Sequence, residues 1–154
     1  MRRLALMLTL TPGLALAGPL IEREGWVVMP TEKPYQQLID DVKVAVKDNK
    51  FGVVTEAGPT GVAASRGITI PGNRVIGVFN NDVAVRVLGL STAAMIEAPI
   101  RMYVTENEDG TADLSYKTPS YVFEPYMAEG GADLAAIAAD LDAVFLTIAE
   151  TAVE

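Results

Sequence analysis

The chain has 154 residues, carries 20 acidic against 12 basic side chains, and contains neither cysteine nor histidine. This length suits one domain, and a net charge of −8 repels the phosphates of nucleic acids and anionic lipids, so we expect no nucleic-acid partner. Without Cys or His, the usual ligands of zinc, blue-copper and iron–sulfur sites are missing, as are Ser-His and Cys-His nucleophilic pairs, so we expect no metal site and no cofactor.

The start of the chain has the pattern of a secretion signal. Two arginines precede an apolar run, residues 4–16, and Ala15-Leu16-Ala17 supplies the small-x-small pattern that a signal peptidase recognises. A helix of that length reaches only ~20 Å, short of the ~30 Å hydrocarbon core of a membrane. We therefore expect cleavage of residues 1–17, no stable membrane insertion afterwards, and a single periplasmic domain formed by residues 18–154.

Apolar spacing and turn residues predict the elements that follow. The first part of the chain should form a strand at 26–29, a helix capped by Thr31 and ending near Asn49, and a strand at 51–56, followed by a loop with one helical turn over 57–72. A central strand at 74–80 and a helix at 82–90, capped by Asn80 or Asn81, come next. The chain should end with a hairpin over 100–117 and a last helix opened by Gly130-Gly131. This order suggests an α+β two-layer sandwich with a mainly antiparallel β-sheet.

The register of the hairpin follows from which residues must share a face. Directly paired residues point to the same side of a sheet. Val104 can therefore oppose Leu114 only across a three-residue loop, Glu108-Asp109-Gly110, in which Gly110 takes the left-handed conformation.

This register defines a first candidate site, formed by Glu106 and Tyr116 on the apolar face. A carboxylate in apolar surroundings has a raised pKa and can act as an acid or base, and a nearby phenol could orient a substrate. The alternative is that Glu106 lies at the rim of the sheet and reaches water or a backbone amide.

A second candidate is the pair Arg101 and Lys117, which face each other on the outer side of the hairpin. Two neighbouring cations in an acidic protein can hold an anion such as a carboxylate or sulfate. Alternatively, they pair with nearby acidic residues or diverge into solvent. Further along, Tyr121, Phe123 and Tyr126 could line a pocket or a partner interface, or could cover the open end of the sheet as ordinary core.

Several segments, in their order and spacing, resemble the domain of unknown function 302 family over roughly residues 35–152. They are Gly67-Ile68-Thr69-Ile70-Pro71, Val75-Ile76-Gly77-Val78-Phe79-Asn80, Ala98-Pro99-Ile100-Arg101-Met102-Tyr103-Val104-Thr105-Glu106, Asp109-Gly110, Leu114-Ser115-Tyr116 and Pro119-Ser120-Tyr121. The resemblance implies a compact α+β fold with helices packed on one face of the sheet, and often a homodimer. It implies no particular activity.

By position, Asn80, Glu106, Tyr116 and Tyr121 match polar or aromatic residues of the family pattern. This chain departs from the pattern at Asp82, where proline is usual, and in having no histidine. Any activity of a relative that used a histidine could not be carried over to this chain.

Three classes of function are open at this point. Since no catalytic set assembles, the first choice is a periplasmic small-molecule-binding or accessory domain for a small or anionic ligand. The alternatives are a hydrolase- or isomerase-like enzyme that uses Glu106 and Tyr116, and a protein-interaction module. A deep pocket would favour the first two, and a flat apolar patch the third. The candidate ligand-binding residues are Asn80, Glu106, Tyr116, Tyr121, Arg101 and Lys117.

Overall fold

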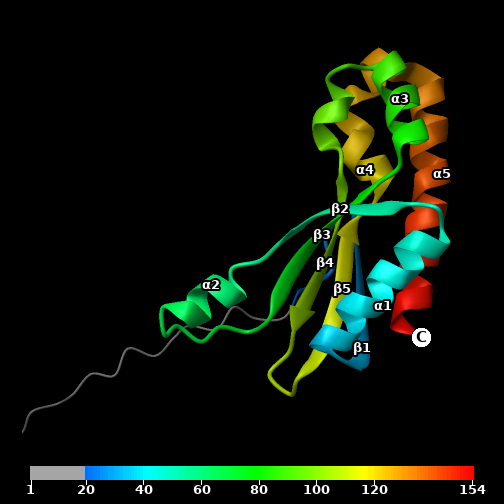
Figure 1. Cartoon of the computed structure of the whole chain (residues 1–154). Coiled ribbons are helices and arrows are strands. Elements are labelled where there is room, and N and C mark those ends of the chain that lie inside the picture. The colour runs from blue at the N-terminus through cyan, green and yellow to red at the C-terminus, as the bar shows by residue number, and fades with distance from the viewer. Residues whose placement is uncertain (1–19) are drawn as a thin grey trace, which may run out of the picture.

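The computed structural model describes residues 20–154, which form one antiparallel sheet with helices. The strands are β1 (Trp26–Pro34), β2 (Gly52–Ala57), β3 (Asn73–Phe79), β4 (Ile100–Glu106) and β5 (Thr111–Lys117). The helices are α1 (Tyr35–Asp48), α2 (Thr60–Ser65), α3 (Asn81–Leu90), α4 (Pro119–Phe123) and α5 (Met127–Val153), with short 3-10 turns η1 (Ala94–Glu97) and η2 (Glu124–Tyr126). The sheet order is β1-β5-β4-β3-β2 (Figure 1), so the expected α+β sandwich is confirmed. The expected signal segment lies outside the described residues.

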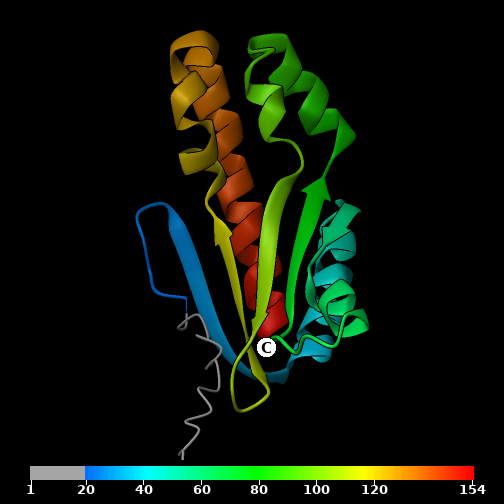
Figure 2. The same cartoon turned by 90° about the vertical axis from the view of Figure 1, so that its left-hand side faces the viewer.

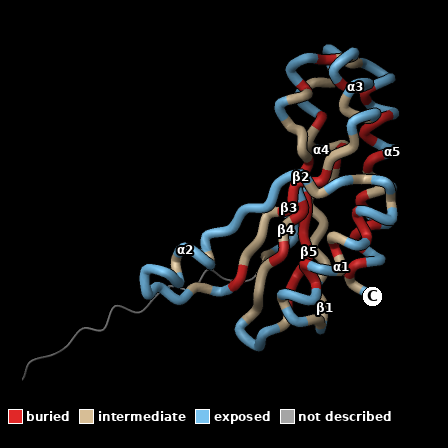
Figure 3. Tube along the Cα trace, viewed as in Figure 1, coloured by how far each residue is buried: buried red, intermediate tan, exposed pale blue. Residues whose placement is uncertain are grey.

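The hydrophobic core lies between one face of the sheet and the helices α1 and α5 (Figure 3). The buried positions of both helices recur at intervals of three and four residues, which is the spacing of one helical face. Each large side chain buried there stabilises the fold by roughly 1.5–3 kcal/mol. The largest of these buried side chains are Leu38, Ile39, Val42 and Val46 from α1, Leu134, Phe145 and Ile148 from α5, and Ile76, Met102, Val104 and Leu114 from the sheet.

The predicted register of the hairpin is confirmed. Val104 pairs with Leu114, and Glu106 with Ala112. Gly110 has a φ of 85°, in the left-handed region, and the Asn107 amide donates to the Thr111 carbonyl at 2.8 Å to close the loop.

The predicted cap of the first helix is wrong. Thr31 lies inside β1, which continues to Pro34 because its backbone pairs with β5, and the Thr31 hydroxyl donates to the Ala112 carbonyl at 2.7 Å. Helix α1 begins only at Tyr35, with Pro34 as its N-cap, and ends at Asp48 as expected. Strand pairing across the sheet therefore outweighed a local capping signal.

The last helix begins a few residues earlier than predicted. It runs from Met127, but Gly131 interrupts it with a φ of 57° and a ψ of −148°. Regular helix with the apolar stripe therefore starts after the glycine pair, close to the predicted place. The segment before it, expected to be irregular, forms α4 and η2.

The opposite face of the sheet is not covered by α1 or α5. Figure 2 looks onto this outer face, with α5 behind the strands. Along β4, Arg101, Tyr103 and Thr105 alternate with the buried core residues and so belong to the outer face. None of the helices between residues 20 and 154 combines the length and the apolar composition that a membrane crossing requires.

Candidate functional site

The outer face of the sheet carries a groove with a volume of about 410 Å³. This volume falls within the roughly 300–1,000 Å³ that small-molecule sites occupy. The lining combines cationic, aromatic and aliphatic side chains with one carboxylate, and its residues are Trp26, Asn73, Val75, Glu97, Ile100, Arg101, Tyr103, Tyr116, Lys117 and Val122. We call this the outer-face groove.

Strand register explains why the charged residues of the groove meet. Trp26 on β1 pairs with Lys117 on β5, and Arg101 on β4 pairs with Gly77 on β3. Continuing the β4–β5 register by one step places Arg101 opposite Lys117. Adjacent strands are ~4.8 Å apart, so Trp26, Lys117 and Arg101 form one row across the sheet. Val75 and Tyr103, which also pair with each other, contribute from the next row on the same face.

Positive charge gathers at this row in an otherwise acidic protein. The Lys117 ammonium lies 5.7 Å from the centroid of the Trp26 ring, and the Arg23 guanidinium lies 5.6 Å from it. Lys117 takes part in none of the ion pairs formed within residues 20–154. The Arg101 side chain is 60% exposed and approaches Glu97 only at 3.9 Å. The Lys117 ammonium and the Arg101 guanidinium are therefore both available to a bound anion.

Glu97 is held in place at the edge of the groove. Its Oε1 accepts a hydrogen bond from the Tyr126 hydroxyl at 2.8 Å, while its Oε2 faces Arg101. The hydrogen bond to Glu97 raises the pKa of Tyr126 above its ordinary value, because ionising the phenol would break it. Among the described residues, the lining of the groove thus contains one fixed negative charge, Glu97, beside two positive ones, Arg101 and Lys117.

Trp26 is positioned by a contact between the start of β1 and α4. The Thr118 amide donates to the Gly25 carbonyl at 2.8 Å. The ring of Tyr121 packs so closely on Gly25 that a Cβ there would lie 2.0 Å from its Cγ. Tyr121 therefore supports the wall of the groove but does not line it.

The structure does not bring Glu106 and Tyr116 together. Glu106 Oε2 accepts a hydrogen bond from the Gly72 amide at 2.6 Å, at the far end of β4. Tyr116 on β5 pairs with Met102 on β4. Met102 lies four residues before Glu106, which is ~13 Å along the strand. The side chain of Tyr116 is buried against Phe145, and burial raises its pKa to about 12. Glu106 thus reaches a backbone amide, as the alternative interpretation held, and Tyr116 contributes to the lining of the groove without it.

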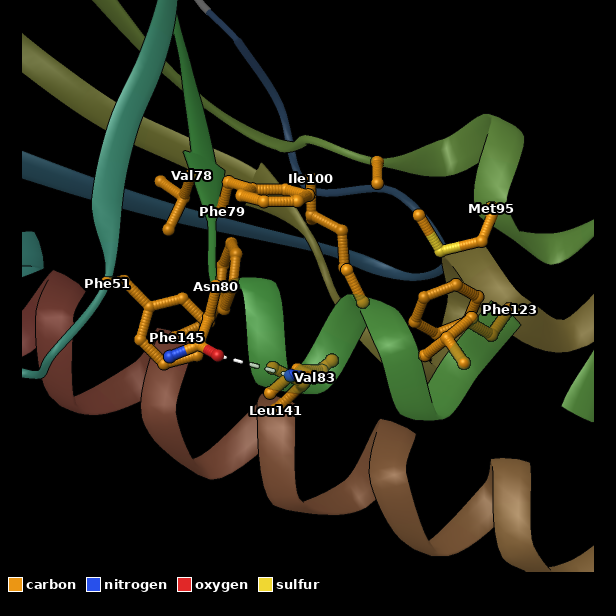
Figure 4. Close-up of a pocket in the computed structure, with 13 residues that line it drawn as sticks. Phe51, Val78, Phe79, Asn80, Val83, Met95, Ile100, Phe123, Leu141 and Phe145 are labelled. Carbon is orange, nitrogen blue, oxygen red and sulfur yellow. Dashed lines mark hydrogen bonds between the residues drawn. The ribbon is translucent and has the colours of Figure 1, made fainter. Parts of the chain in front are cut away.

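Asn80 caps a helix at the opposite end of the sheet from Glu106. Its Oδ1 accepts from the Val83 amide at 3.1 Å, and its Nδ2 donates to the Lys50 carbonyl at 3.0 Å, as expected for the cap of α3. Asn80 also borders a second cavity, of only about 40 Å³, between α3, α5 and the end of β3 (Figure 4). That volume holds little more than one water molecule, and the walls are apolar side chains that include Phe51, Phe123 and Phe145.

The three aromatic residues before the last helix have three different roles. Phe123 is buried in the core, Tyr121 packs on Gly25, and Tyr126 holds Glu97. Within residues 20–154, no group of three or more acidic side chains is placed to hold a metal ion.

Sequence reasoning found Arg101 and Lys117 but missed Trp26, Tyr103 and Glu97 as parts of the same site. The alternation along β4 already put Tyr103 on the face of Arg101, so that signal was present. The pairing of β1 with β5 and the position of η1 left no comparable local signal.

Comparisons with known proteins agree with this fold. The family model described as "Domain of unknown function DUF302" matches residues 27–150. The crystal structure of the uncharacterized conserved protein DUF302 from Bacillus stearothermophilus superposes with a TM-score of 0.73 at 18% sequence identity, covering 84% of this chain and 98% of that one. No curated protein matches the chain. On the family match over most of its length, this chain belongs to the DUF302 family.

Proposed function

We propose that this protein is a binding domain for a small organic anion, which occupies the outer-face groove. The observation that carries the proposal is that Arg101 and Lys117 stand side by side at a groove of about 410 Å³ in a chain with a net charge of −8. A guanidinium offers two parallel donors to a carboxylate, and an ammonium adds a second, compact charge. Binding rather than catalysis is favoured because Glu106 and Tyr116, the candidate acid–base pair, lie far apart.

Thermal unfolding in the presence of small carboxylates tests the proposal. A ligand at one hundred times its dissociation constant stabilises the folded state by ~2.7 kcal/mol, so the melting temperature of the wild-type protein should rise with carboxylate concentration. We expect the rise to shrink strongly in Arg101→Gln and Lys117→Gln.

Two matched variants provide the control. Arg86 on α3 and Lys47 on α1 are exposed and lie outside the outer-face groove. Arg86→Gln and Lys47→Gln remove the same charges, so both should respond to carboxylates like the wild type. An equal response in all five proteins would show that the groove is not the site, and no response in any would refute anion binding.

We further propose that the domain works in the periplasm after export. The support is the arginine pair, the apolar run and the Ala15-Leu16-Ala17 pattern at the start of the chain. Expression of the full chain in a bacterium should yield a periplasmic protein that begins at Gly18, as read by intact mass. Native mass spectrometry of the same sample also reports the number of chains per particle, which tests the expected homodimer, and any bound small molecule.

A further inference from the structure

We infer that the ligand of the outer-face groove is an aromatic monocarboxylate, an inference that rests on the anion-binding function proposed above. Two features of the lining lead to it. One is the balance of charge among three side chains, and the other is the placement of aromatic rings around the cations.

The charge balance favours a ligand with a single negative charge. Arg101 and Lys117 contribute two positive charges to the lining, and Glu97 contributes one negative charge. Glu97 cannot easily turn away, because Tyr126 holds its other oxygen at 2.8 Å. A dianion would satisfy both cations but would place its second charge near this carboxylate, and like charges brought together discriminate against such a ligand. A monocarboxylate neutralises the charged side chains that line the groove, whereas Arg23 lies on the Trp26 ring outside this lining.

The arrangement of the rings favours an aromatic body. Lys117 lies over the Trp26 ring at 5.7 Å, so a carboxylate bound to this ammonium brings whatever it is attached to beside the indole. Tyr103 and Val75, paired across β4 and β3, extend the lining in the next row. Stacked or edge-to-face ring pairs strengthen binding beyond the burial of apolar area. A flat ring therefore fits the wall better than a saturated one of the same size.

Four probes that differ in one property each separate these contributions. Benzoate has the ring and one charge, cyclohexanecarboxylate has the charge without the aromatic ring, benzyl alcohol has the ring without the charge, and phenylphosphonate at pH 8 is a dianion. Trp26 is the sole tryptophan of the chain, so a change in its fluorescence reports binding at the groove, alongside calorimetry.

We expect benzoate to bind roughly threefold to tenfold more tightly than cyclohexanecarboxylate, in keeping with the strength of a ring pair. Benzyl alcohol and phenylphosphonate should each bind at least about tenfold more weakly than benzoate. Benzyl alcohol has no negative charge for the two cations, and phenylphosphonate brings a second negative charge close to the Glu97 carboxylate. The Trp26 emission should change with the same midpoint as the calorimetric titration.

Two variants test the assigned roles. Glu97→Gln should strengthen phenylphosphonate binding relative to benzoate, because it removes the repelling carboxylate while keeping an acceptor for Tyr126. Tyr103→Leu should reduce the preference for benzoate over cyclohexanecarboxylate, with Trp26 accounting for what remains, while cyclohexanecarboxylate still binds. Neither effect is expected if these side chains serve only the stability of the fold.

The outcomes separate this inference from the proposal on which it rests. If neither carboxylate binds, anion binding itself fails. If both carboxylates bind equally, the groove is an anion site but the inferred aromatic class is wrong. If phenylphosphonate binds more tightly than benzoate in the wild-type protein, the inferred single charge is wrong.

Discussion

Lys117 and Trp26 are direct neighbours across β5 and β1, and the ammonium of the lysine lies 5.7 Å from the centroid of the indole ring. A cation at this distance from a ring face is attracted to it, by about 0.5–1 kcal/mol at exposed sites. The ring therefore orients the lysine at the outer-face groove without neutralising it. A carboxylate partner would have neutralised the charge of Lys117. The contact with the Trp26 ring instead keeps the lysine ordered and leaves its charge available to a bound anion.

The contact between Gly25 and Tyr121 should control how firmly the start of β1 is held. Gly25 has a φ of 70°, and a Cβ would overlap the Tyr121 ring. Gly25→Ala should lower the free energy of unfolding by about 2–4 kcal/mol, the sum of backbone strain and overpacking. Gly67→Ala is the control, because Gly67 has a φ of 75° but open space around it, and it should cost only about 1 kcal/mol. Equal losses in urea unfolding would show that the ring contact is unimportant.

Glu106 should behave as a structural residue. Its carboxylate accepts from the Gly72 amide, and its own amide donates to the Gly72 carbonyl, so it joins the start of β3 to the end of β4. Glu106→Ala should lower the free energy of unfolding by about 1–3 kcal/mol, because a part-buried amide loses its acceptor. Glu106→Gln should retain most of the stability, since its amide oxygen can still accept. Glu108→Ala, at the exposed tip of the hairpin, is the control and should have little effect.

Burial of Tyr116 should make stability depend on pH in the alkaline range. The pKa of this phenol rises from 10.0 to about 12 on folding, first because of burial and then because of the charges of Asp142 and Glu150. Between about pH 10 and 12 the unfolded chain loses the proton and the folded chain keeps it, so stability falls as pH rises, by up to about 3 kcal/mol. Tyr116→Phe should remove this part of the decline, measured by urea unfolding at each pH. Tyr121→Phe, on the exposed face of α4, should retain it.

The ion pair between Lys33 and Asp41 should contribute stability that disappears in acid. Lys33 Nζ donates to Asp41 Oδ2 at 2.8 Å and to the Ala152 carbonyl at 2.9 Å, joining β1 to α1 and to the end of α5. The hydrogen bond from Lys33 lowers the pKa of Asp41 below 3.8. The contribution, about 1 kcal/mol, is therefore present above that value and lost as pH falls through the lowered pKa. A double-mutant cycle of Lys33→Met with Asp41→Asn should show coupling at pH 7 that declines as the pH falls below 3.8, and coupling that stays undiminished in acid would contradict the assignment.

Local patterns in the sequence were enough for most of the secondary structure. The stripes of α1 and α5 and the register of the β4–β5 hairpin follow from side-chain periodicity and loop length. These features depend on residues that are close together in the chain. A one-residue slip in the hairpin would turn every apolar side chain of a strand to the wrong face, so the apolar pattern fixes the register. The same constraint on register puts Arg101 opposite Lys117 on the outer side of the hairpin.

The site as a whole depends on contacts between segments that are distant in the chain. Only the pairing of β1 with β5 brings Trp26 to Lys117, and that pairing also turned Thr31 from the expected helix cap into a strand residue. The partner of the Glu106 carboxylate, the backbone amide of Gly72, is likewise known only from the tertiary structure. Periodicity identifies the face on which a side chain lies but not which other strand comes to lie beside it. The sequence by itself therefore determined most of the elements, the register of the hairpin and the paired cations, whereas tertiary packing decided which aromatic and acidic residues surround them.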